Sequence, residues 1–109
     1  MELRRALDIQ HTAHAAESSR SVSVSLNLAK VLIGQRRYDE ASILYSSVLP
    51  VQERLLGSKA PEVATTLEDF ARLLHTMQSH KLAGELEARA KRIRAELAYT
   101  RSVKDSHRW

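Results

Sequence analysis

Cysteine is absent from this chain of 109 residues, which also contains only three glycines and two prolines. Without thiols, neither a disulfide framework nor a thiolate metal site can form, so the packing of side chains has to supply the stability. The scarcity of glycine excludes a glycine-rich phosphate loop and leaves long uninterrupted stretches of sequence. This composition is typical of a single small domain of packed helices.

No stretch of the chain approaches the roughly 20 apolar residues of a membrane span. Residues 1–10 alternate charged with apolar side chains and lack the continuous apolar core of a signal peptide. We therefore expect no membrane partner and a cytoplasmic location, with an organellar one left open.

The chain repeats its own pattern at an offset of 42 residues. When the sequence is aligned with itself at this offset, apolar residues match residues of the same kind: Ala29 matches Ala71, Leu32 matches Leu74, Ala41 matches Ala83, Leu44 matches Leu86, Val51 matches Ile93 and Leu55 matches Leu97. A period of roughly 20 to 50 residues is typical of stacked repeats, in which each unit buries its apolar face against its neighbours. The repeat predicts an all-α solenoid that serves as a binding surface.

Apolar residues at steps of three and four predict the helices of this solenoid. The first lies within residues 21–33 and is broken by Gly34. The second runs from Tyr38 to about Leu56, with a kink or an early end at Pro50, because proline removes a backbone hydrogen bond and crowds the preceding turn.

The later boundaries follow from glycine, proline and polar residues. Gly57 closes the second helix, and Pro61 suits the first turn of the third. A polar turn at residues 78–79 leads to a last helix that ends near residue 98. Its apolar residues occupy one face and charged residues surround them, which is typical of the end cap of a repeat array.

The front of the chain opens partway through a repeat, since residues 1–10 fall on the middle of the second helix. We expect a leading half unit at 1–17, full units at 20–57 and 60–98, and a basic tail at 101–109. An array usually needs at least three repeats to be stable by itself. The chain is therefore expected either to be a fragment or to self-associate or dock on a larger complex, through Leu3, Leu7 and Ile9.

Short motifs at the predicted turns carry a family resemblance. They are Leu26-Asn27-Leu28-Ala29, Arg37-Tyr38-Asp39-Glu40-Ala41, Leu44-Tyr45, Leu55-Leu56-Gly57 and Ala60-Pro61-Glu62-Val63-Ala64. Over about residues 2–98 the chain resembles the tetratricopeptide repeat in the 42-residue form of kinesin light chain. The second unit departs from the pattern, with His80-Lys81-Leu82-Ala83 at the turn. HEAT-type helix pairs have a similar period but lack the Tyr-Asp-Glu-Ala signature.

The resemblance implies a right-handed α-solenoid of antiparallel helix pairs, with a concave groove that takes an extended peptide or a partner's helix. Helical spacing places Ser23, Leu26, Lys30 and Ile33 together on the first helix, and Thr65, Glu68, Arg72 and His75 together on the third. Asn27 matches a family asparagine that holds a ligand's backbone, and Asp69 stands at the equivalent place in the next unit. For each residue the alternative is an ordinary solvated helix position.

Enzyme chemistry finds little support in the sequence. The serines of residues 18–25 have no base partner at a diagnostic spacing and are better explained as capping hydroxyls. His11 and His14 are spaced to share a helix face, and His75 and His80 to meet around a turn, but neither pair has a convincing third ligand. We therefore expect no catalytic site, no metal and no cofactor.

The net charge of +4 belongs to the C-terminal end, since residues 81–109 hold eight Lys and Arg against four Asp and Glu. Arg101, Lys104, Arg108 and Trp109 are chemically able to contact nucleic acid. The interleaving of basic with acidic residues in the last helix and the few aromatic residues argue against that partner. A solvated cap helix is preferred, followed by a tail that stays disordered after Tyr99 unless a partner orders it.

Together these patterns predict a non-enzymatic module that binds a protein or peptide partner in a groove. Docking of a small structural subunit through its open N-terminal helix is the alternative, and RNA binding ranks below both. Charge reversal at Lys30 or Arg72 is expected to abolish groove binding, whereas docking is expected to be sensitive to polar substitution at Leu3, Leu7 or Ile9.

Overall fold

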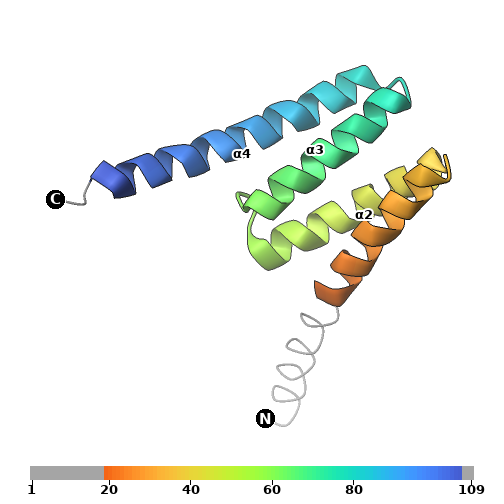
Figure 1. Ribbon diagram of the computed structural model, residues 1–109, viewed down its shortest axis with the longest axis horizontal. Helices are drawn as coiled ribbons and strands as arrows, with labels where there is room; N and C mark the ends of the chain where they lie inside the picture. Colours follow the sequence, from red (N-terminus) through yellow and green to blue (C-terminus); the bar gives the residue numbers. More distant parts are fainter. Residues whose placement is uncertain (1–18, 107–109) are drawn as a thin grey trace, which may run out of the picture.

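The computed structural model describes residues 19–106, and this part of the chain is all-α, with no strand. A first helix covers residues 19–34 and is called helix 19–34 below. It is followed by α2 (Tyr38–Leu56), α3 (Pro61–Thr76) and α4 (His80–Ser106). Each helix turns back beside the one before it, so the four pack as sequential pairs (Figure 1). The predicted fold class is confirmed.

Two turns share one backbone geometry, 42 residues apart. Arg36 and Gln78 both adopt the left-handed conformation, with φ of 61° and 68°. The next residue in each turn donates its N–H to a carbonyl five residues back, from Arg37 to Leu32 at 2.8 Å and from Ser79 to Leu74 at 2.7 Å. This is the Schellman arrangement, which satisfies the last carbonyls of a helix. The repeated apolar pattern is thus accompanied by a repeated helix ending.

Two predicted boundaries agree with the structure. α2 ends at Leu56, and Gly57 follows with a φ of 91°, a conformation that glycine adopts without steric cost. α3 begins at Pro61 after an extended Ala60, because the first position of a helix needs no N–H donor.

The break expected at Gly34 also agrees, since helix 19–34 ends at this residue, and Arg36 is the left-handed residue of the turn that follows. Two other expectations about helix ends were wrong. An early end of α2 at Pro50, one of the two outcomes expected there, does not occur, because buried Leu49 and Gln52 hold the helix on both sides of the proline. α4 continues to Ser106 where we expected a disordered tail, since its last 20 residues contain no proline or glycine.

Alanines at matching positions of the two helix pairs are fully buried, and we infer that the helices of each pair cross there. Ala29, Ala41, Ala71 and Ala83 are each at most 1% exposed, which allows the backbones to approach closely. Larger side chains fill the space around them: Tyr45, Leu49, Val63, Leu67, Phe70, Leu73, Leu74 and Ile93. The rings of Tyr45 and Phe70 stack with centroids 5.4 Å apart and join α2 to α3. Within residues 19–106, no helix has the length and apolar content needed to cross a membrane.

Enlarging one crossing alanine is expected to force the helices apart. Ala83→Leu should lower the free energy of unfolding by about 1–3 kcal/mol, because extra methylenes in a packed core displace side chains and backbone. Ala88→Leu, on the exposed side of the same helix, should change it by less than about 0.5 kcal/mol. Urea unfolding followed by circular dichroism measures both. Equal effects of the two substitutions would contradict the close crossing.

Candidate interaction groove

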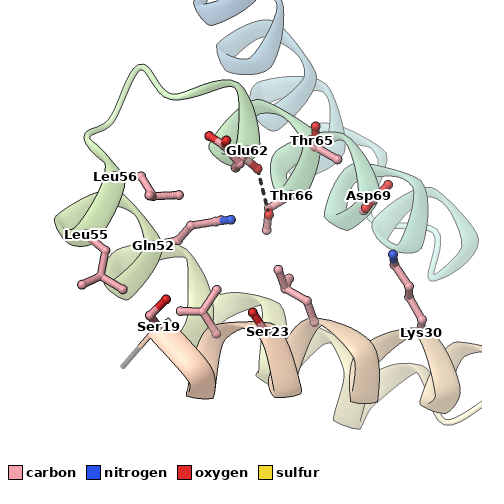
Figure 2. A pocket seen from close by; sticks show the side chains of 12 residues that line it. Ser19, Ser23, Lys30, Gln52, Leu55, Leu56, Glu62, Thr65, Thr66 and Asp69 are labelled. Atoms are coloured by element: carbon pink, nitrogen blue, oxygen red, sulfur yellow. Dashed lines mark hydrogen bonds between the residues drawn. The ribbon is translucent and has the colours of Figure 1, made fainter. Parts of the chain in front are cut away.

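A groove of about 520 Å³ lies where helix 19–34 faces the end of α2 and the start of α3 (Figure 2). Its wall is formed by aliphatic side chains from two helices, with polar groups on α3 opposite. The lining residues are Ser19, Val22, Ser23, Leu26, Lys30, Gln52, Leu55, Leu56, Glu62, Thr65, Thr66 and Asp69. This groove is the candidate site.

Half of the ten residues predicted for a groove lie together in this one: Ser23, Leu26, Lys30, Thr65 and Asp69. Ile33 and Arg72 line a second hollow that shares Lys30 and Asp69 with the first. Glu68 and His75 instead border a hollow against α4. Asn27 is exposed and lines none of these three hollows. The ten residues are thus divided between this groove, the second hollow and the hollow against α4, and their role in binding stays a prediction.

Residues of α2 were missed by the sequence reasoning. Gln52, Leu55 and Leu56 form one side of the groove, although a groove lined by the first helix of each pair was expected. The available signal was that apolar residues of this helix lie on two faces, with Leu44, Val48 and Val51 on one and Tyr45 and Leu49 on the other. The motif containing Leu55 and Leu56 marks the end of α2, but nothing in its local pattern shows that helix 19–34 lies opposite.

Gln52 forms the floor of the groove and is 3% exposed. Its Oε1 is buried and accepts no hydrogen bond from residues 19–106. Thr66 lies opposite, but its hydroxyl donates to the carbonyl oxygen of Glu62 at 3.1 Å, drawn as a dashed line in Figure 2. Buried polar atoms are nearly always paired, so this acceptor requires an explanation.

Charges lie at the two ends of the groove. Lys30 is exposed and forms no ion pair within the described part of the chain, while Asp69 pairs with Arg72. Glu62, at the other end, likewise has no ionic partner among residues 19–106. Beneath Asp69, burial raises the pKa of the Tyr45 phenol, and the Asp69 carboxylate raises it further. The Lys30 end is therefore positive and the Glu62 end negative.

Side chains of α4 engage three of the predicted residues, Thr65, Glu68 and His75. Arg94 contacts Glu68 at 2.8 Å and the Thr65 hydroxyl at 3.1 Å. The hydrogen bond from Arg94 lowers the pKa of Glu68. On the same side, His75 forms an ion pair or hydrogen bond with Glu87.

His75 and His80 meet around the turn as expected, with Nδ1 atoms 2.8 Å apart. His75 uses its other ring nitrogen toward Glu87, so the three side chains do not point at one common position. In the described residues no three His, Asp or Glu side chains are arranged to hold a metal ion.

Helix 19–34 has an open apolar face. Val24, Leu28 and Val31 are 65%, 45% and 54% exposed, whereas their counterparts 42 residues later, Thr66, Phe70 and Leu73, are at most 6% exposed. The later residues are covered because α3 has another helix pair before it. This face of helix 19–34 thus corresponds to the face that α3 buries, and no described residue covers it.

The opposite end of the stack is polar. Tyr45, Leu49 and Gln52 are buried where α2 meets the next helix pair. Their counterparts on α4 are Glu87, Lys91 and Arg94, all exposed. The two ends differ because charged residues on α4 replace the side chains that a further repeat would cover.

Some predicted features lie outside the described residues. These are the docking residues Leu3, Leu7 and Ile9, the half unit at 1–17, His11 and His14, and the end of the tail with Arg108 and Trp109. The division into units at 20–57 and 60–98 stays a prediction.

A family model of the tetratricopeptide repeat matches residues 20–96 of the chain. This range includes α2, α3 and most of helix 19–34 and of α4. No curated protein matches the chain.

Glu68→Gln is expected to lower the Tm of the protein by an amount that depends on pH. The folded-state pKa of Glu68 is lowered, so its ion pair stabilises the fold fully above the ordinary pKa of glutamate, and this stabilisation is lost as the pH falls through the lower folded value. The variant should therefore have a lower Tm than wild type near neutral pH, and the difference in Tm should shrink as the pH falls through the lowered pKa of Glu68. The effect should be small, because both side chains are about two-fifths exposed.

Thermal unfolding by circular dichroism across this pH range tests the expectation. Glu85→Gln is the matched control, since this exposed carboxylate makes no ion pair within residues 19–106. A Tm difference for Glu68→Gln that does not change with pH would show that the ion pair is not its cause.

Proposed function

The chain belongs to the tetratricopeptide repeat family, and from that premise we propose that it is a non-enzymatic interaction module that binds a segment of another protein in the groove described above. Tetratricopeptide repeats act through their surfaces, and the matched region extends from helix 19–34 into α4. The offset of 42 residues supports the finer assignment to the kinesin-light-chain-like form of the repeat.

The groove itself supports this proposal most directly. Its volume of about 520 Å³ falls within the range of about 300–1,000 Å³ that is typical of ligand sites. Leu55 and Leu56 are 37% and 51% exposed at its edge, so apolar area is available for a partner to cover. An apolar wall with a few polar groups at fixed places is the usual composition of a binding site.

Peptides selected on the immobilised protein from a random display library test the proposal. Lys30→Glu should weaken the binding of the selected peptides several-fold, because it replaces a cation that has no ionic partner within residues 19–106 with an anion. Lys81→Glu is the matched control, since Lys81 is exposed on α4 and lines none of the three hollows. Fluorescence anisotropy gives the affinities. If the library yields no peptide, or both reversals weaken binding equally, groove binding is disproved.

Docking through the open face is a second candidate function. The exposed stripe of Val24, Leu28 and Val31 favours it, because the equivalent positions of α3 are covered by a neighbouring helix pair. Burying a Leu or Val side chain contributes roughly 1.5–3 kcal/mol. A second copy of the chain that covers this stripe would complete the array.

Leu28→Glu is expected to reduce the mass of the self-associated protein to that of a monomer, because it places a charge in the centre of the stripe. Ile43→Glu is the matched control, since Ile43 is also exposed, at 65% against 45% for Leu28, and its counterpart 42 residues later, Glu85, is exposed as well. Light scattering at several concentrations measures the masses, with circular dichroism to verify helix content. A wild-type chain that is monomeric at every concentration disproves self-association.

A further inference from the structure

The buried amide of Gln52 is the least explained group in the described structure. Its Oε1 has no partner within residues 19–106 although the side chain is 97% buried. Leaving such an acceptor unpaired destabilises a fold, whereas an apolar side chain of similar volume would not. A residue that is unfavourable for the folded state by itself is a candidate for a role in binding.

The direction of Gln52 points to the groove. The side chain extends from α2 toward α3 and ends in the space between Leu56 and Thr66 (Figure 2). Thr66 cannot donate to it, because its only hydroxyl hydrogen is used on the Glu62 carbonyl. In Figure 2 the amide nitrogen is the atom that faces the groove, whereas Oε1 is buried behind it. Rotation of the terminal amide about its last, broad torsion turns the oxygen toward a molecule that enters the groove.

An extended peptide has the groups that this amide needs. A carboxamide accepts a hydrogen bond through its oxygen and donates through its nitrogen. The N–H and C=O groups of an extended backbone are free to pair with it, whereas those of a helix are already paired within the helix. Gln52 thus favours an extended segment over a partner's helix.

The surroundings of Gln52 define the side chains of that segment. Leu26 on one side and Leu55 and Leu56 on the other provide an aliphatic wall. Lys30 at one end has no ionic partner among the described residues, and the neighbouring Asp69 is neutralised by Arg72. An aliphatic side chain beside the leucines and a carboxylate beside Lys30 complement this arrangement.

We propose that Gln52 anchors the backbone of an extended peptide whose aliphatic residue lies against Leu26, Leu55 and Leu56, and whose neighbouring acidic residue faces Lys30. This rests on the proposed function and names its ligand class. It assigns the role of backbone anchor to α2, where the family resemblance had pointed to Asn27 on the preceding helix.

One measurement needs no ligand. Gln52→Met keeps the length of the side chain and removes the buried amide, so the Tm of the free protein should rise or stay unchanged. A clear fall in Tm would show that the amide stabilises the fold, which would overturn the inference. Gln35→Met, at an exposed position outside the groove, is the matched control.

The second measurement uses peptides selected from a random display library on the wild-type protein, then synthesised with each backbone nitrogen methylated in turn. Methylation at one position should weaken binding by about five- to tenfold, which is the loss of affinity expected when one hydrogen bond is removed. Gln52→Met should weaken the unmethylated peptide by a similar factor, and methylation at that position should then have no further effect. The selected peptides should share an aliphatic residue next to Asp or Glu.

The outcomes separate the two proposals. If no peptide is selected, the proposed function fails and this inference fails with it. If peptides bind and are weakened by Lys30→Glu but not by Gln52→Met, the groove is a binding site and the role of Gln52 is overturned. If the effects of methylation and of Gln52→Met simply add, the two groups do not contact each other, and the inference is likewise overturned.

Discussion

The burial of α3 between two neighbours is the constraint on which the described structure depends. Half of its residues, eight of 16, are buried, and it contacts α4 on one side and α2 on the other. Phe70 stacks on Tyr45 on one side, while Ala71 allows close packing in the same turn. Because α3 is held on both sides, its free edge near Glu62 and Asp69 is fixed opposite helix 19–34, and this opposition creates the groove.

The same requirement explains why the two ends of the stack differ. Each helix pair buries its apolar surface against the next, so an array must end on a face that tolerates water. α4 meets this need with Glu87, Lys91 and Arg94 at positions where α2 has buried residues. Helix 19–34 does not, because its outer face presents Val24, Leu28 and Val31. The apolar end is therefore the one suited to association and the charged end the one suited to solvent.

Stability and binding make opposing demands at the groove. A core residue in place of Gln52 would pack without leaving a buried acceptor unpaired, and a paired Lys30 would lose its attraction for an incoming carboxylate. Both features are unfavourable or neutral for the fold and favourable for a ligand. They lie within one groove beside the exposed Leu55 and Leu56. One binding site explains the unpaired amide, the cation and the exposed leucines more simply than three independent packing defects do.

Local sequence determined the helices, the buried alanines and the charged outer face of α4, because the spacing of apolar residues and the effects of Gly57 and Pro61 act over a few residues. It also brought five of the ten predicted groove residues together. Only the tertiary structure decided that Glu68 and His75 pair with α4 and that Gln52 lies at the floor of the groove. Those outcomes depend on the reach of side chains between helices and on the angle between neighbouring helix pairs. Neither can be predicted from the spacing of residues along a single helix.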